Sequence, residues 1–251
     1  MNCFATRATK STIAVHAVTA DGLKDWLKGQ NAAVRAWVKS NCFRAGAGNI
    51  LMLPGEDGAA AQAVLGVERL DDIWSWGGAA TKFPEGRFRI VTELDARAAT
   101  HAAIGWALGS YRFNRYKDTG FTARELVWPK QADRTLAWAV AEGICLTRDL
   151  INTPASDMGP SELADAAKTL ARAFKGKCTV IKGEDLLKKN FPMIHAVGRA
   201  SSRAPRLIDL TWGRKDAPKV TLVGKGVCFD SGGLDLKPSG NMLLMKKDMG
   251  G

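Results

Sequence analysis

Residues 218–251 read PKVTLVGKGVCFDSGGLDLKPSGNMLLMKKDMGG, and this stretch decides how the rest of the chain is interpreted. Its apolar run at 220–223 is rich in β-branched residues and predicts a strand. A glycine-rich loop and a turn follow, and they carry four charged residues: Lys225, Asp230, Lys237 and Asp248. Open α/β sheets present ligand-binding groups at the carboxyl ends of their strands. The combination of lysines and aspartates on such a loop indicates a metal or anion site.

Two phosphate-binding motifs are excluded at this loop. A P-loop needs glycine five residues before its Gly-Lys pair and Ser or Thr after it, but Lys219 and Gly226 stand at these positions. A dinucleotide fingerprint needs a third glycine where Phe229 stands. From the residues alone, a solvated turn with scattered charges stays the alternative, because a glycine-rich loop is weak evidence by itself.

The donor types favour a divalent metal ion. The carboxylates of Asp230 and Asp248 are hard oxygen ligands suited to Mg, Mn or Zn. Lysine is an unusual ligand, because its amine must lose a proton, and a nearby dication favours that loss. The chain has three histidines, none of them in the loop, and no His-Glu-x-x-His. A histidine-based zinc protease is therefore excluded.

Several ordered motifs resemble the leucine aminopeptidase family, the two-metal cytosolic aminopeptidases. The similarity runs almost without gaps over residues 223–251. Upstream, NTPASDMGP at 152–160 and HAVGRASSRAPRL at 195–207 are also similar to the family. The resemblance covers roughly residues 130–251, and the rest of the chain more loosely.

The resemblance implies roles for five residues. The positions matching Lys225, Asp230 and Asp248 hold two divalent ions, manganese or zinc, with Asp230 near both. The position matching Lys237 is the catalytic lysine, which stabilises the tetrahedral intermediate. Met245 matches a position that lines the pocket for the first side chain of the substrate.

The implied function is that of a metal-dependent aminopeptidase. It would release N-terminal amino acids, leucine-like ones preferred, from peptides by attack of a metal-activated hydroxide. A cytoplasmic homo-hexamer is the implied assembly of the complete protein. Two alternatives stay open: a non-catalytic truncated or scaffold form of the family, and a basic nucleic-acid-binding role.

The resemblance also implies ligands that lie further along the chain. Family members continue past the position of Gly251 with an Asn-Thr-Asp-Ala-Glu-Gly-Arg-like segment, which supplies the remaining carboxylates and a catalytic arginine. We therefore expect residues 1–251 to be a fragment or a truncated product. On their own they should be inactive and hold at most one metal ion weakly.

The composition of the chain limits which broad class of protein it can be. A chain of 251 residues holds one large or two modest domains, and 46% hydrophobic with 24% charged residues is ordinary for a globular protein. No apolar run reaches the ~18 residues of a membrane span, and residues 1–10 contain no export signal. Five scattered cysteines indicate reduced thiols in a cytoplasm, and Cys228 is expected to be buried filler.

The net charge of +11 is spread over several clusters. No RNA- or DNA-binding motif accompanies them, and basic residues alternate with aromatic ones only at 111–116. Charge alone gives a non-specific, salt-sensitive affinity. We therefore do not take nucleic acid as the main partner.

The overall pattern predicts an α/β fold, with a small N-terminal α/β domain followed by the first part of a mixed, mainly parallel catalytic sheet flanked by helices. Residues 1–125 form the first domain, 126–155 a connecting helix opened by Asp133, and 156–251 the start of the catalytic domain. Ser161 is expected to be the N-cap of a helix. The predicted strands are 12–18, 50–53, 88–91, 178–181 and 206–212, and the other predicted helices are 23–39, 96–110, 161–174 and 184–189.

Overall fold

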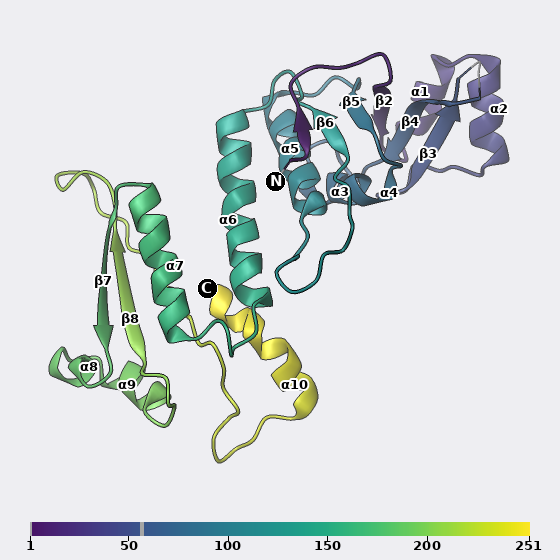
Figure 1. Ribbon diagram of the computed structural model, residues 1–251. Coiled ribbons are helices and arrows are strands. Elements are labelled where there is room, and N and C mark those ends of the chain that lie inside the picture. Colours follow the sequence, from purple (N-terminus) through teal and green to yellow (C-terminus); the bar gives the residue numbers. More distant parts are fainter. Residues whose placement is uncertain (1, 56–57) are drawn as a thin grey trace. The chain divides into compact units, whose positions relative to one another are not determined.

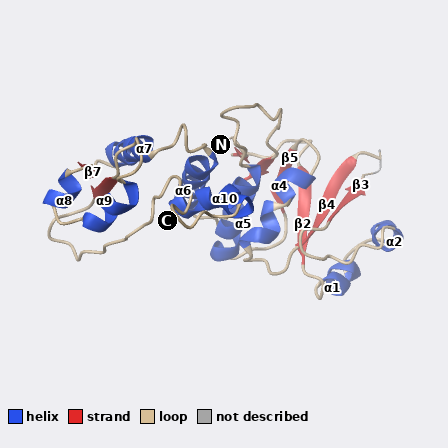
Figure 2. Cartoon of the chain, turned by 90° about the horizontal axis from the view of Figure 1, so that it is seen from below, coloured by secondary structure: helices blue, strands red, loops and turns tan. Residues whose placement is uncertain are grey.

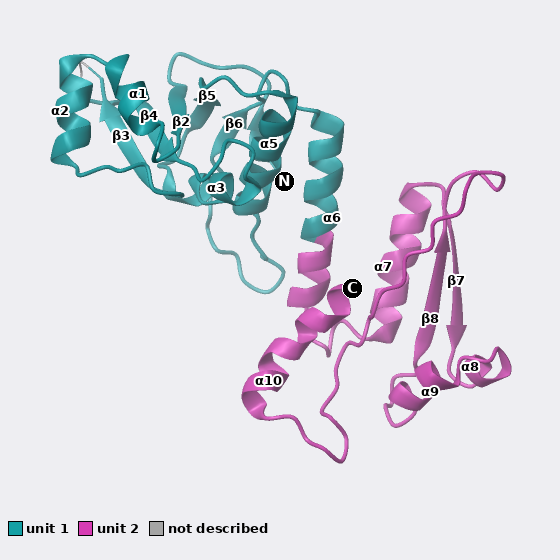
Figure 3. Ribbon diagram, turned by 180° about the vertical axis from the view of Figure 1, so that it is seen from behind, with its two compact units in different colours: residues 1–145 teal, residues 146–251 magenta. Residues whose placement is uncertain are grey.

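The computed structural model describes residues 2–55 and 58–251, which form two compact units, residues 1–145 and 146–251 (Figure 1). The change of unit falls inside helix α6 (Arg134–Asn152), which takes both colours in Figure 3. The division of the chain at 125 and 155 stays a prediction. Among the described residues, no helix combines the length and apolarity needed to cross a membrane.

The first unit is built on a six-stranded sheet in the order β1-β6-β5-β2-β4-β3. All neighbouring pairs are parallel except β3 with β4, so the mainly parallel α/β class is confirmed. Figure 2 shows these strands in red and the helices around them in blue. The strands are β1 (Phe4–Ala5), β2 (Ile13–Val18), β3 (Ile50–Pro54), β4 (Ala60–Gly66), β5 (Arg87–Ile90) and β6 (Glu125–Val127).

The alternation of side chains along the strands produces two core layers. Ala63 and Leu65 of β4 pack with α3 (Ile73–Gly77), α4 (Ala79–Lys82) and α5 (Ala96–Ser110). Val64 between them packs in a second cluster with residues of α1 (Leu23–Lys28) and α2 (Ala32–Ser40). Successive residues of a strand face opposite sides of the sheet, so both faces are covered by helices.

Two predictions in this unit are wrong. The helix expected at 23–39 is divided at residues 29–31, where Gly29 ends α1 and the Asn31 side chain caps α2 by accepting from the Val34 N–H at 2.9 Å. Strand β4 was not predicted, because its Ala-Ala-Gln-Ala start has low β-propensity. The short strands β1 and β6 were also not predicted, because their sequences show no strand pattern.

Helix α6 begins where Asp133 predicts. The Asp133 carboxylate accepts a hydrogen bond from the Leu136 N–H at 2.9 Å and caps the first turn. At the other end, the Thr153 N–H still reaches the Asp149 carbonyl at 3.0 Å. The next donor would be residue 154, but Pro154 has no N–H. The helix therefore ends there, and the Leu150 carbonyl has no partner within the helix.

The second unit contains two strands, β7 (Lys177–Lys182) and β8 (Arg206–Thr211), packed against α7 (Pro160–Ala173). The strands pair antiparallel, whereas the alternation of strands and helices predicted parallel neighbours. Between them lie only α8 (Asp185–Lys188) and α9 (Pro192–Gly198). These helices are too short to return along a six-residue strand, which a parallel crossover requires.

The start of α7 also differs from the prediction. The helix begins at Pro160, with Gly159 as N-cap residue, so Ser161 is not the cap. The Gly159 N–H donates to the Glu162 carboxylate at 2.9 Å, which is the half of a capping box that the N3 side chain supplies. Ser161 instead accepts a hydrogen bond from Arg206 Nη2 at 2.9 Å. Its hydroxyl therefore links α7 to β8.

The chain from 217 to 232 contains no strand, so the strand predicted at 220–223 is wrong. Val220, Leu222 and Val223 are 82%, 91% and 94% exposed. A β-strand needs a neighbouring strand for its N–H and C=O groups, and β7 and β8 pair only with each other. Beyond this segment lie α10 (Ser239–Leu244) and a 3₁₀ turn, η1 (Met245–Gly250).

Candidate metal and catalytic site

A compact loop from Asp230 to Lys237 brings a lysine and a carboxylate together. The Asp230 carboxylate accepts from the Gly232 N–H at 2.8 Å. Gly232 and Gly233 then take φ values of 93° and 66°, which reverse the chain and favour glycine. The loop closes where the Lys237 N–H donates to the Ser231 carbonyl at 2.9 Å. The two glycines therefore set the distance between Asp230 and Lys237, which stand at the two ends of the loop.

The closed loop places Lys237 Nζ 2.8 Å from Asp230 Oδ2. This hydrogen bond, together with that from Gly232, holds the pKa of the Asp230 carboxyl below its usual range. The charge of Lys225 lowers the same pKa further. Asp230 is thus an ionised carboxylate with two lysines near it, and an ionised carboxylate is the form that binds a cation.

Lys225 and Asp248 form the second pair, with Lys225 Nζ 3.8 Å from Asp248 Oδ2. Their segments lie directly against each other, because a Cβ at Gly224 would overlap the Gly251 carbonyl oxygen. A Cβ built at Gly251 would stand only 3.2 Å from the Lys225 nitrogen. Four of the five predicted site residues therefore form two ion pairs.

The turn that carries Asp248 is docked on the end of α6. Lys246 Nζ donates to the Leu150 carbonyl at 3.0 Å and also contacts Met249 Sδ. Burial lowers the pKa of the Lys246 ammonium. Met249 lies in a small buried cluster with Met158 and Cys228. No sequence motif indicates Lys246, although Pro154 predicts that a carbonyl at the helix end needs a donor.

Met245 and Cys228 are both buried. The expectation that Cys228 is buried filler is confirmed, and burial raises the pKa of its thiol. Among the described residues the cysteines are thiols rather than disulfides. The role of Met245 in a substrate pocket stays a prediction.

The donor set fits a divalent ion. Each of Asp230 and Asp248 faces a lysine ammonium, so each carboxylate already stands next to positive charge that a metal ion could replace. Lys225 could add its amine once deprotonated. Within the described part of the chain, His, Cys, Asp and Glu form no group of three or more that could hold a metal. The donors that the two ion pairs offer to such an ion are the carboxylates of Asp230 and Asp248 and the amine of Lys225.

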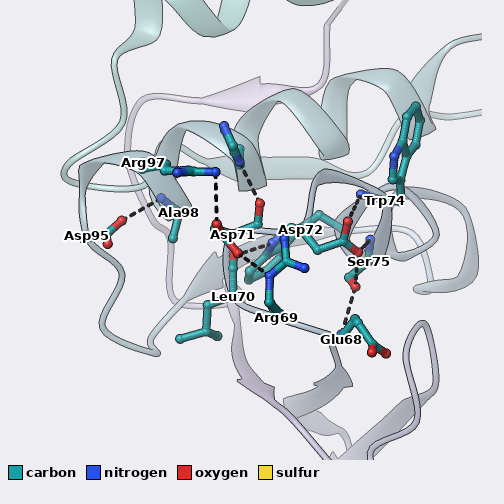
Figure 4. Close-up of polar contacts among 12 residues, drawn as sticks. Glu68, Arg69, Leu70, Asp71, Asp72, Trp74, Ser75, Asp95, Arg97 and Ala98 are labelled. Atoms are coloured by element: carbon teal, nitrogen blue, oxygen red, sulfur yellow. Dashed lines mark hydrogen bonds and ion pairs between the residues drawn. The ribbon is translucent and has the colours of Figure 1, made fainter.

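The first unit has a separate polar cluster at the end of β4 and the starts of α3 and α5 (Figure 4). Asp71 lies between Arg69 Nε at 3.0 Å and Arg97 Nη2 at 3.4 Å, and the Arg69 hydrogen bond lowers the pKa of Asp71. Asp72 caps α3 by accepting from the Ser75 N–H at 2.9 Å. These charges pair with one another and hold loops in place. A cavity of about 460 Å³ beside them is lined by Thr19, Glu68, Arg69, Leu70, Asp71, Asp95, Arg97 and Ala98.

Two family models match this chain, one over each half. Residues 145–251 match the cytosol aminopeptidase family, catalytic domain, and residues 13–129 match the M17 aminopeptidase, N-terminal domain. The chain belongs to the M17 cytosol aminopeptidase family. The resemblance found in the loop motifs is thereby confirmed, and it extends to the first unit.

The relatives agree with this assignment. A probable cytosol aminopeptidase of Rhodococcus jostii is 37% identical over 223 residues, which are 79% of this chain and 44% of that protein. The structure of the cytosol aminopeptidase of Coxiella burnetii is 46% identical with a TM-score of 0.90, and covers 100% of this chain and 55% of its own. The bottromycin maturation enzyme BotP in complex with Mn is 31% identical with a TM-score of 0.75, over 96% of this chain and 53% of that one. The chain thus spans about half the length of the relatives that it matches.

Proposed function

We propose that this chain carries catalytic residues of a metal-dependent aminopeptidase that releases N-terminal amino acids, leucine-like ones preferred, from peptides. The observation that carries the proposal is the loop that holds Lys237 Nζ 2.8 Å from Asp230, in a chain of the cytosol aminopeptidase family. Such a loop presents a fixed positive charge beside a metal-binding carboxylate. Metal-assisted hydrolysis of an amide bond uses both elements, because the positive charge stabilises the oxyanion and the carboxylate would hold the metal ion that activates water.

Lys225, Asp230 and Asp248 would hold two divalent ions, with Asp230 shared between them. Manganese or zinc is proposed, and a similar protein is named in complex with Mn. When bound, these ions would supply Lewis-acid activation of water and of the scissile carbonyl. Two carboxylates and a lysine amine are the donors that this chain offers for that purpose.

Lys237 would act on the substrate itself. Its ammonium would donate a hydrogen bond to the carbonyl oxygen as negative charge develops there. The double glycine and the bond from Lys237 N–H to the Ser231 carbonyl hold its backbone in place before substrate arrives. Met245 would line the pocket for the first side chain. The complete protein would act as a homo-hexamer in the cytoplasm.

Leucine release from leucinamide tests the proposal. The assay uses the protein that carries this chain, with added manganese or zinc, and a matched sample treated with a chelator. We expect metal-dependent release that the chelator abolishes and that returned metal restores. Release that is indifferent to metal, or no release at all, would overturn the proposed function.

A further inference from the structure

The 3₁₀ turn that carries Asp248 is attached to the last turn of α6 by a partly buried polar contact. Lys246, two residues before Asp248, donates from Nζ to the Leu150 carbonyl at 3.0 Å. Both elements belong to the second unit, where Figure 3 shows them in magenta. A cation at the carboxyl end of a helix is favoured by the exposed carbonyls and by the helix dipole.

The acceptor of this contact is created by the Asn152-Thr-Pro154 motif. In a continuing helix, the N–H of residue 154 would bond to the Leu150 carbonyl. Pro154 has no N–H, and the Thr153 N–H bonds to Asp149. The Leu150 carbonyl therefore needs a donor from elsewhere, and Lys246 supplies it. Two motifs almost a hundred positions apart in the chain meet here, since Lys246 and Leu150 are separated by 96 positions.

Packing of the two residues that follow Asp248 fixes the same geometry. Met249 is buried among side chains that include Leu150 and Ile151. A Cβ at Gly250 would stand 2.7 Å from Ile151 Cδ1 and 3.3 Å from Thr147 Cγ2. The backbone of the turn thus lies against α6, with Asp248 held between two anchored positions. Its carboxylate faces outward, 3.8 Å from Lys225 Nζ.

We propose that Lys246 is a positioning residue of the metal site, which fixes the Asp248 carboxylate by tying its turn to the Leu150 carbonyl. The inference rests on the proposed function, in which Asp248 is a metal ligand. By charge alone, an ammonium near a cation site opposes the binding of a cation. Replacing Lys246 by a neutral residue should therefore weaken metal binding if its geometric role dominates, and strengthen it if its charge dominates.

Manganese affinity of the full chain separates the two effects. Free Mn²⁺ is measured by its electron paramagnetic resonance signal in titrations of the wild type, Lys246→Met and Lys247→Met. Lys247 is the matched control, because it is exposed, equally charged and adjacent to Asp248. We expect Lys246→Met to weaken binding about tenfold, the lower end of the loss that follows when a group that orients a metal ligand is removed. Lys247→Met should bind equally or more tightly, and Lys246→Arg should retain most of the affinity.

A second variant covers the case in which Lys246→Met fails to fold, as judged by circular dichroism. Pro154→Ala leaves every charge in place but adds an N–H that competes for the Leu150 carbonyl, and it should also weaken Mn²⁺ binding. Unchanged affinity in Lys246→Met, an equal loss in both methionine variants, or unchanged affinity in Pro154→Ala would overturn the inference. Unchanged affinity in Asp248→Asn would instead contradict the ligand role on which the proposed function depends.

Discussion

The two units differ in where their large apolar side chains lie. In the first, Trp76, Trp106, Phe83 and Phe88 are fully buried between the sheet and its helices. In the second, large apolar side chains of the loop and of α10 are exposed: Val220, Leu222, Val223, Phe229, Leu234, Leu236, Leu243 and Leu244. The first unit is therefore held by its core.

The candidate site is held by other means. Its residues are positioned by a glycine turn, two ion pairs, the contact of Lys246 with α6 and the small cluster around Met249. Such contacts are individually weak at exposed positions. The comparison teaches that local chain geometry, more than burial, places the chemistry in this protein.

Replacing one apolar residue in each unit by alanine tests this contrast. The largest expected effect is on the free energy of unfolding. Trp106 lies with its ring centroid 5.8 Å from Phe88 and donates from Nε1 to the Arg124 carbonyl at 2.9 Å. Trp106→Ala should lower the free energy of unfolding by about 3–5 kcal/mol, through the lost contacts and the cavity that remains. Leu222→Ala should change it by less than about 0.5 kcal/mol, because that side chain is already in water.

Urea denaturation followed by tryptophan fluorescence measures both variants. Seven of the eight tryptophans precede residue 146, so the signal reports mainly on the first unit, and circular dichroism reports on the whole chain. Equal losses of stability in the two variants would show that the exposed segment is packed in solution. The contrast between the units would then be wrong.

Removing the positive charge of Lys237 should lower the rate of hydrolysis and leave the stability of the first unit unchanged. In the protein that carries this chain, Lys237→Ala should lower kcat for leucinamide on the order of a hundredfold or more, because a preorganised positive group at the oxyanion is lost. Metal content should stay close to that of the wild type. The matched control is Lys219→Ala, an exposed lysine in the same segment. Near-normal turnover of Lys237→Ala would contradict the role assigned to this lysine.

Where local signals were strong, the sequence predicted the fold well. The helix at 96–110 is predicted with its observed bounds from its small residues, and the structure adds that the Asp95 side chain caps it. Strand β4 was missed, since Ala60–Gly66 acquires its strand character from β2 and β3 on either side. The run at 220–223 fails in the opposite way. Its residues favour a strand, but neither strand of this unit pairs with it.

The candidate site was predicted by motif rather than by geometry. The residues Lys225, Asp230, Lys237 and Asp248 were singled out from spacing and resemblance, and the structure brings them together as two pairs. The contact between Lys246 and Leu150 could not be predicted. It depends on how the 3₁₀ turn packs against α6 in the folded chain. From the sequence, Pro154 indicates only that the Leu150 carbonyl lacks a donor within the helix.

The central claim is that the exposed loop binds a divalent cation through particular carboxylates, and metal content tests it most directly. Asp230→Asn and Asp235→Asn remove the same charge from the same loop, but only Asp230 is within hydrogen-bonding distance of Lys237 Nζ. Both variants are dialysed against Mn²⁺ together with the wild type and analysed by elemental analysis. We predict that Asp230→Asn loses bound manganese and that Asp235→Asn retains the wild-type amount. Equal manganese content in the two variants would contradict the account.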